Sequence, residues 1–291
     1  MRIFLTGGTG FVGRHLRVAL HEAGHAVTAL TRHPLPDEAG LTWAKGTLDD
    51  ADALAAGMAG CDAVVHLVGI IRETRGATFA QVHVGGTAQV LAAMGKTGVT
   101  RLLHMSALGA EPEAETEYFH TKWEAEQLVR ATGVDATIFR PSLVFGPGAG
   151  FTEPLIHQLQ SYPVIPIIGS GEYTFMPISI HAVCAAFVQT LALDGPTRGQ
   201  AFDLCGPEVM SYASILLTLA NALNVRKPVV HVPIGFMRLV IGMAETLHLP
   251  FPITNEQLTM LLAGSRCARR EVLPFDLPEI SFKEGIAEMF E

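Results

Sequence analysis

Short apolar runs alternate with longer amphipathic segments along the first third of the chain. We expect the runs to be strands and the intervening segments to be helices. Because the runs are almost continuously apolar, both faces of each strand should be buried, as in a parallel sheet covered by helices on both sides. The predicted strands are RIFLT (2–6), AVTALTR (26–32), LTWAKGTL (41–48), CDAVVHLVGII (61–71) and TRLLHMSAL (100–108). The pattern predicts an α/β fold whose ligands lie beyond the C-terminal ends of the strands.

A glycine-rich turn joins the first predicted strand to the first helix in RIFLTGGTGFVGRHL. Gly7, Gly10 and Gly13 recur every three residues, which permits a tight turn, an approach of backbone N–H groups to a pyrophosphate, and close packing of helix on strand. Its place between strand and helix favours a Rossmann-type, doubly wound dinucleotide site over an ordinary glycine loop. The residues predicted to contact the cofactor here are Gly7, Thr9, Gly10, Phe11, Val12 and Gly13.

The end of the second predicted strand bears on the type of dinucleotide. A carboxylate at this position would hydrogen-bond the ribose 2′-hydroxyl of NAD, but the sequence has Thr31 and Arg32. A hydroxyl and a cation suit the 2′-phosphate of NADP, so we expect NADP rather than NAD. The alternative is that Arg32 is a solvated residue at the end of the strand.

The chain contains one HExxH sequence, at His21 to His25. A zinc site would need both histidines on one face of a continuous helix. Gly24 is typical of a helix end, and strand-like sequence follows at once, so His25 is predicted to lie beyond the helix. We therefore predict no metal site.

Composition narrows the class of protein. With 291 residues the chain can form one large domain or two unequal ones, and a formal charge of -8 without a run of lysines or arginines makes nucleic acid an unexpected partner. The four cysteines lack CxxC spacing, so neither a disulfide framework nor a zinc clasp is expected, and a reducing cytoplasm is the predicted location. They are Cys61, Cys184, Cys205 and Cys267.

The most apolar long segment is VPIGFMRLVIGMAETLHLP (232–250). Arg238 and Glu245 interrupt it, and glycines and prolines punctuate it, so we expect no transmembrane helix. We interpret it as a core helix of a smaller domain. The alternatives are an interaction surface or a lid over an apolar substrate.

The motifs TGGTGFVG, HLVG, HMSA, YFHTK and FRPSLVFGPG occur in the order typical of short-chain dehydrogenases/reductases. The chain resembles the extended and atypical members of that superfamily, namely NAD-dependent epimerases/dehydratases, the nucleotide-binding accessory subunit of respiratory complex I, and NmrA-like proteins. The resemblance implies a cofactor domain at 1–150, to which 177–204 returns, and a mostly helical substrate domain formed by 151–176 and 205–291. It also implies cofactor contacts from Leu48, Leu67, Val68, Gly69, Ser106, Lys122, Arg140, Pro141 and Val144. For Arg140, a structural salt bridge is the alternative.

Tyr118 and Lys122 lie four residues apart, so on a helix they share one face. An adjacent ammonium lowers the pKa of a tyrosine, which could then exchange a proton with a substrate carbonyl or alcohol. The resemblance implies that Lys122 also holds the nicotinamide ribose. Ser106 serves as the carbonyl donor in the shorter register of the simple reductases, whereas in the register of the epimerases the catalytic serine is missing.

Three hypotheses for function follow. The first is an NADP(H)-dependent oxidoreductase or epimerase-like enzyme that uses Tyr118, Lys122 and Ser106 on an unidentified carbonyl or alcohol, with an apolar substrate favoured by the composition of the second half. The second is a non-catalytic nucleotide-binding accessory or assembly protein, associated peripherally with a membrane complex. The third is a sensor that distinguishes NADP from NADPH.

Overall fold

The computed structural model describes residues 1–33, 35–36, 40–193, 195–247, 249, 251–268 and 272–290. The chain forms two compact units, which are considered separately below. The first unit comprises Met1–Pro141, Ile180–Leu204 and Glu271–Pro278, and the second comprises Ser142–Ser179, Cys205–Arg270 and Glu279–Glu291. The division into a cofactor domain and a substrate domain, in the functional sense, stays a prediction.

A seven-stranded sheet forms the centre of the first unit, with the strands in the order β11-β6-β5-β4-β1-β2-β3. All its neighbouring strands are parallel. The strands are β1 (Arg2–Thr6), β2 (Ala26–Thr31), β3 (Leu41–Lys45), β4 (Ala63–His66), β5 (Arg101–Met105), β6 (Asp135–Pro141) and β11 (Ala201–Leu204). The order reverses between β1 and β4, the position at which doubly wound sheets bind their ligands. The predicted Rossmann-type fold is confirmed.

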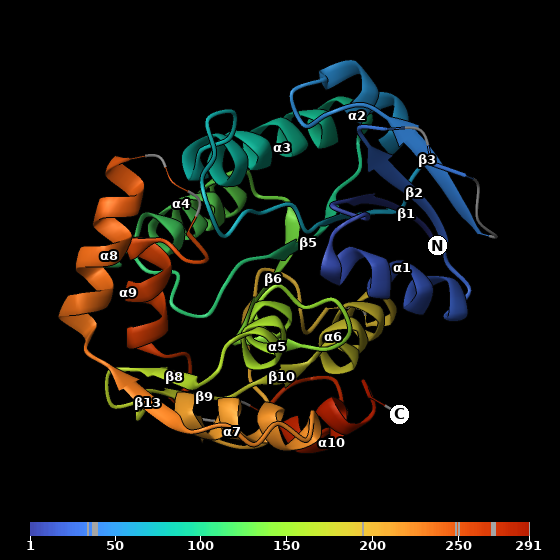
Figure 1. The fold of residues 1–291 in the computed structure, drawn as a ribbon. Helices are drawn as coiled ribbons and strands as arrows, with labels where there is room; N and C mark the ends of the chain where they lie inside the picture. Colours follow the sequence, from blue (N-terminus) through green and yellow to red (C-terminus); the bar gives the residue numbers. More distant parts are fainter. Residues whose placement is uncertain are drawn as a thin grey trace. The chain divides into compact units, whose positions relative to one another are not determined.

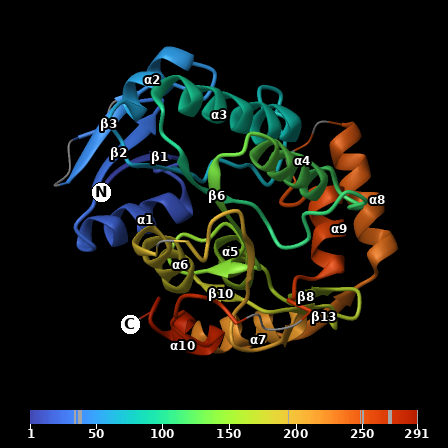
Figure 2. The ribbon, with the colours of Figure 1, turned by 180° about the vertical axis from the view of Figure 1, so that it is seen from behind.

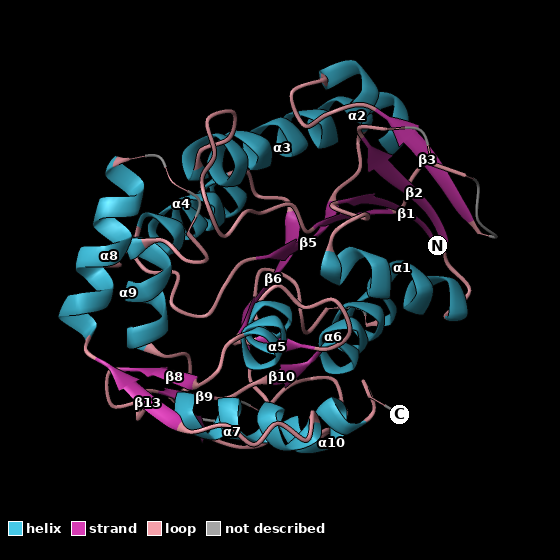
Figure 3. Cartoon of the chain, in the orientation of Figure 1, coloured by secondary structure: helices cyan, strands magenta, loops and turns pink. Residues whose placement is uncertain are grey.

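Helices cover both faces of this sheet. Figures 1 and 3 show α1 and α6 on one face and α2, α3 and α4 on the other. Phe4, Val64 and Leu102 on successive central strands pack against Leu54 of α2 and Met94 of α3. The helices are α1 (Phe11–Glu22), α2 (Ala51–Met58), the π-helix η1 (Ala80–Gly85), α3 (Gly86–Thr97), α4 (Glu117–Ala131) and α6 (Ile180–Ala192). Since α1 ends at Glu22, His25 lies beyond the helix, as predicted.

The second unit consists of helices and three pairs of short strands, β7 with β10, β9 with β12 and β8 with β13. Its core gathers buried apolar side chains from three helices, among them Leu159, Leu219 and Phe282. The strands are β7 (Val144–Phe145), β8 (Ile165–Ile168), β9 (Thr174–Phe175), β10 (Ile178–Ser179), β12 (Met210–Ser211) and β13 (Val229–Val232). The helices are α5 (Thr152–Ser161), α7 (Tyr212–Ala222), α8 (Ile234–Thr246), α9 (Asn255–Ala263) and α10 (Phe282–Ala287). Among the described residues, no helix is both long and apolar enough to span a membrane.

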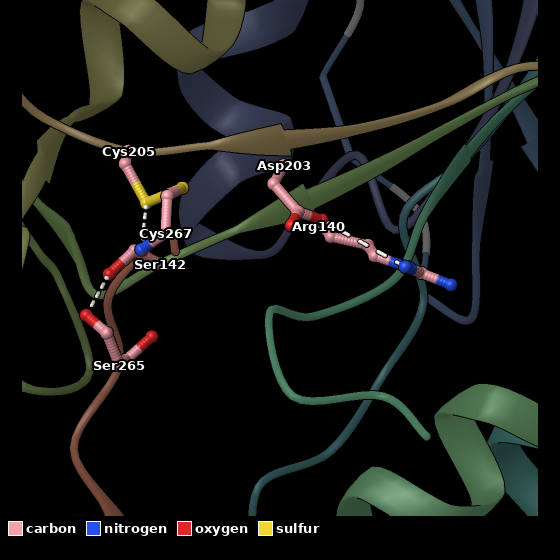
Figure 4. The surroundings of a disulfide bond; sticks show 6 residues. All are labelled: Arg140, Ser142, Asp203, Cys205, Ser265 and Cys267. Carbon is pink, nitrogen blue, oxygen red and sulfur yellow. Dashed lines mark hydrogen bonds and ion pairs between the residues drawn. A yellow bond between two sulfur atoms is a disulfide. The ribbon is translucent and has the colours of Figure 1, made fainter. Parts of the chain in front are cut away.

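A disulfide joins Cys205 and Cys267 in the second unit, which corrects the expectation that the cysteines form none (Figure 4). The two residues are 62 positions apart, and tertiary structure brings their Cα atoms within 6.2 Å. Beside the disulfide, Ser142 Oγ donates a hydrogen bond to the Ser265 carbonyl at 2.8 Å. Cysteine spacing could not reveal this pair because CxxC rules concern local clasps only.

We expect reduction of this disulfide to lower the free energy of unfolding of the second unit by about 2 to 4 kcal/mol, because the bond closes a long loop in the unfolded chain. Urea unfolding with and without a reductant measures the difference. The double variant Cys205→Ser, Cys267→Ser is the control and should unfold at the reduced midpoint under both conditions. Equal midpoints for the oxidised and reduced protein would contradict the prediction.

Candidate functional site

The glycine turn has the geometry that its spacing predicts. Gly7 adopts a φ of 79°, in the left-handed region that favours glycine, and its carbonyl accepts a hydrogen bond from the Gly10 N–H at 3.0 Å. A Cβ on Gly13 would lie 2.1 Å from the Gly7 oxygen, so no side chain fits there. Gly10 begins α1 without a side-chain cap, which leaves the first N–H groups of the helix to an anion.

The ends of β4 and β5 bring the other predicted residues to the same edge of the sheet. The segment from Leu67 to Gly69 directly follows β4. Ser106 directly follows β5, the strand paired with β4. A Cβ on Gly69 would lie 2.9 Å from Lys122 Nζ, so the absence of a side chain makes room for the ammonium. These residues of the first unit therefore converge beside the glycine turn.

Lys122 is buried and donates a hydrogen bond from Nζ to the Met105 carbonyl at 3.1 Å. Burial lowers the pKa of its ammonium to about 8, although the Glu126 carboxylate opposes this shift. Tyr118 lies one helical turn earlier on α4, whose first turn is capped by Thr116. The predicted helical placement of the pair is thus observed.

The hydroxyl of Tyr118 has a pKa of about 12, raised by burial. The sequence predicted the opposite shift, because a nearby ammonium favours the phenolate. The rings around Tyr118 explain the difference: Phe79, His83 and Phe119 meet it edge-on, with centroids 5.8, 5.4 and 5.1 Å away. Tyr118 is half-buried among these rings, and the cost of desolvating the phenolate raises its pKa.

Ser106 is buried, and its backbone N–H donates to the Phe139 carbonyl at 2.7 Å. Within the described part of the chain its Oγ has no hydrogen-bond partner. A buried hydroxyl without a partner calls for an explanation, and a ligand oxygen is one. The Ser106 hydroxyl can therefore donate a hydrogen bond to a ligand oxygen.

Three buried histidines, His66, His83 and His104, lie near Lys122. Burial, reinforced by the Lys122 charge, lowers the pKa of His66 and His83 to about 3 and that of His104 well below its ordinary value. All three rings are therefore neutral at pH 7. The sequence analysis did not single out this cluster, although His66 and His104 occupy paired positions on neighbouring strands.

Threonine hydroxyls and one backbone group form hydrogen bonds with two of these rings. His66 lies 2.6 Å from Thr6 Oγ1 and 3.2 Å from Thr87 Oγ1. His83 Nδ1 lies 2.9 Å from Thr121 Oγ1, and the Ile70 N–H donates to His83 Nε2 at 3.2 Å. The His104 ring centroid lies 5.3 Å from that of His66, and neither of its nitrogens has a hydrogen-bond partner among the described residues.

The adenosine side of the predicted site has no carboxylate at the end of β2. Arg32 is exposed there, and Thr31 Oγ1 donates to the His33 carbonyl at 2.8 Å. Leu48 follows β3, and its side chain occupies the space above Gly86 of α3. The cofactor contacts of these residues and the preference for NADP stay predictions.

Arg140 takes part in a charge cluster. Its guanidinium donates to both carboxylate oxygens of the fully buried Glu126, at 2.7 and 2.5 Å, and lies 3.9 Å from Asp203 (Figure 4). The salt-bridge alternative therefore describes Arg140, and a further contact with a cofactor stays a prediction. Pro141 ends β6 in the first unit, whereas Val144 lies in β7 of the second.

A model of the NAD dependent epimerase/dehydratase family matches residues 3–203, from β1 into β11. The chain belongs to this family. The resemblance inferred from its motifs is thereby confirmed for the family as a whole. Catalytic roles for individual residues remain to be proposed.

Proteins that are similar to this chain differ in what they do. The 2-alkyl-3-oxoalkanoate reductase of Stenotrophomonas maltophilia is 28% identical over 99% of this chain and 98% of its own. NADH dehydrogenase (ubiquinone) 1 alpha subcomplex subunit 9, mitochondrial, of Arabidopsis thaliana is 27% identical over 87% of this chain. This chain spans 66% of that subunit, just under two thirds. UDP-glucose 4-epimerase from Thermotoga maritima, solved with UDP-glucose, matches 100% of this chain and 98% of its own, with a TM-score of 0.75 at 19% identity.

Proposed function

We propose that the protein is an NADP(H)-dependent oxidoreductase that reduces an apolar ketone or oxidises the corresponding alcohol. The observation that carries this proposal is the convergence of the buried Ser106 Oγ and the Lys122 ammonium beside the glycine turn, with Tyr118 on the same helix as Lys122. The reductase relative, which aligns over nearly its whole length, supports the same class of reaction.

When bound, the nicotinamide supplies or accepts the hydride. Ser106 Oγ donates a hydrogen bond to the substrate oxygen and fixes its position. In reduction, the Tyr118 hydroxyl would give its proton to the carbonyl oxygen, which would leave an alcohol and a Tyr118 phenolate. The Lys122 ammonium stabilises that phenolate until solvent returns the proton.

The test is a fluorescence titration of nucleotide-free protein with NADPH and with NADH, followed by turnover of NADPH with a panel of medium-chain and aryl ketones. We expect selective binding of NADPH and oxidation of NADPH that depends on the ketone. Failure to bind either nucleotide would reject the proposal, and binding without turnover of any ketone would favour the second candidate below.

Preference for NADPH should depend on Arg32, which is exposed at the end of β2, where the described residues Thr31 to His33 include no carboxylate. We expect Arg32→Gln to weaken NADPH binding about tenfold, because one charge-assisted hydrogen bond to the 2′-phosphate is lost. Binding of NADH, which lacks this phosphate, should stay unchanged. Arg226→Gln, in the second unit, is the matched control, and equal weakening of both nucleotides by Arg32→Gln would remove it from cofactor selection.

A second candidate function is that of a nucleotide-binding accessory protein of a respiratory assembly. The raised pKa of Tyr118 favours it, because a phenol with a pKa of about 12 stays protonated at neutral pH and so cannot accept the proton of an alcohol, and one relative is a subunit of a mitochondrial NADH dehydrogenase. In this case a bound dinucleotide raises the melting temperature by mass action without turnover. Co-purification with a membrane complex, unchanged in Tyr118→Phe, would support it.

A further inference from the structure

We propose that the outward face of α8 is an interface through which two copies of this chain form a symmetric dimer. This face is formed by Phe236, Leu239, Met243 and Leu247, here called the outer stripe, which are 57, 61, 57 and 62% exposed. Their spacing of three, four and four residues places them on one side of the helix. The proposal is independent of the reaction proposed above.

The opposite side of α8 is already packed. Ile241 and Ala244 are buried, and Ile241 forms a small core with Leu258 of α9 and Ile168 of β8. Figures 1 and 2 show α8 running beside α9. The helix is therefore apolar on both sides, although the second unit covers only one of them. A helix with this pattern is expected to be covered on both sides. The interpretation of 232–250 as a core helix is thus wrong for the outer stripe.

Exposed apolar side chains concentrate around this stripe. Of the 17 large apolar side chains that are exposed among the described residues, eight lie between positions 229 and 249, including Val229, Val230, Ile234 and Leu249 besides the outer stripe. The four side chains of the outer stripe, at roughly 60 to 100 Å² each, present about 240 to 400 Å². A stable interface takes about 800 Å² from each partner, so the polar residues that border the stripe would supply the rest of a dimer interface.

Charge favours a second copy over an anionic bilayer. Arg238 and Glu245 are the charged residues of α8. Glu245 accepts two hydrogen bonds from Asn255, at 3.0 and 2.9 Å, and Arg238 donates to Thr259 Oγ1 at 3.3 Å. The four residues of the outer stripe are uncharged and Arg238 is the one basic residue of α8, whereas a helix that binds anionic lipid carries several lysines or arginines on its polar face. The formal charge of -8 also opposes an anionic surface, but two neutral apolar faces can meet.

The shape of the face is self-complementary. A groove of about 520 Å³ runs along it, lined by Arg238, Leu239, Gly242, Met243, Thr246 and Leu247. The small residues Gly242 and Thr246 form a depression beside the ridge of the larger side chains. A Cβ on Gly242 would have only Asn255 Nδ2 nearby, at 3.8 Å, so the space above it is open. A twofold axis across the helix would place the ridge of each copy in the depression of the other.

Sedimentation velocity on the full chain, from about 1 to 100 µM, tests the proposal. We expect a reversible dimer whose dissociation constant rises at least about 100-fold in Leu239→Glu, because the glutamate would be buried without a partner. Leu217→Glu on α7, at an exposed leucine of the same unit, is the matched control and should dimerise like the unchanged protein. Circular dichroism establishes that both variants fold.

A cross-link locates the interface. Met243→Cys should form an intermolecular disulfide on mild oxidation, because the twofold axis brings the two copies of this position together, whereas Leu217→Cys should not. A monomer at all concentrations, or a dimer that Leu239→Glu leaves intact, would overturn the proposal. Binding of a monomer to vesicles of phosphatidylcholine and phosphatidylglycerol, lost in Leu239→Glu, would assign the outer stripe to a bilayer instead.

Discussion

The folded protein should lose stability steeply as the pH falls below 6.5, because three buried histidines stay neutral in the fold. Their pKa values are lowered in the folded protein, to about 3 for His66 and His83 and in the same direction for His104. In the unfolded chain they regain their ordinary pKa of 6.5 and bind protons first. The stabilisation is therefore complete above pH 6.5 and is lost progressively on acidification until the folded histidines protonate.

The expected size is large. Each histidine contributes about 1.4 kcal/mol per pH unit over this window, so three contribute about 4 kcal/mol per unit, or about 5 kcal/mol between pH 6.5 and 5. That is comparable with the whole stability of an ordinary domain. Urea midpoints of the first unit at pH 7.5, 6 and 5 measure the slope. Carboxylates add their own dependence, so the test is the difference between variants.

The substitution His104→Met removes one of the three histidines that take up a proton on unfolding. Because neither nitrogen of His104 has a hydrogen-bond partner among the described residues, its removal should cost little at pH 7.5 and reduce the slope by about one third. His157→Gln, at an exposed position of α5, is the control and should keep the slope of the unchanged protein. An identical slope in His104→Met would mean that His104 titrates alike in the folded and unfolded states.

Local pattern was sufficient for five of the seven strands of the sheet, because the central parallel strands are buried on both faces and so are almost wholly apolar. The five predicted strands correspond to β1 to β5, although 61–71 is a strand only at Ala63–His66. The apolar run continues beyond the sheet because Leu67 and Val68 cross its edge beside the glycine turn. Periodicity also could not show that the helical segment ending at Thr97 starts as the π-helix η1.

Properties set by distant residues could not be read from local pattern. The Cys205–Cys267 bond joins segments 62 positions apart, and the guanidinium of Arg140 is held by Glu126 from a different element. The pKa of Tyr118 depends on Phe79 and His83, which reach it from the segment before α3. The outer stripe of α8 is as apolar as the face of a core helix, but the second unit does not cover it. In our proposal a second copy of the chain does.

Replacement of Tyr118 by phenylalanine should abolish most hydride transfer while leaving cofactor binding in place. Loss of a positioned proton donor costs about 100- to 10,000-fold in rate, or about 3 to 5 kcal/mol of transition-state stabilisation. The phenylalanine ring retains the edge-on contacts of Tyr118, so the fold and the Kd for NADPH should change little. The readout is kcat/KM for ketone reduction beside the NADPH titration, with Tyr162→Phe, at an exposed tyrosine, as the control.

Because the pKa of Tyr118 is raised, reduction and oxidation should respond differently to pH. Reduction needs the protonated phenol, which persists to about pH 12, so proton donation by Tyr118 is available throughout the neutral range. Oxidation needs the phenolate and should rise with pH. Lys122 has a pKa of about 8, so in the proposed mechanism its support of the phenolate ends above that pH and the rise should weaken there. Turnover that survives in Tyr118→Phe would remove Tyr118 from the mechanism, whereas NADPH binding without turnover in the unchanged protein would make the dinucleotide a structural ligand of an accessory protein.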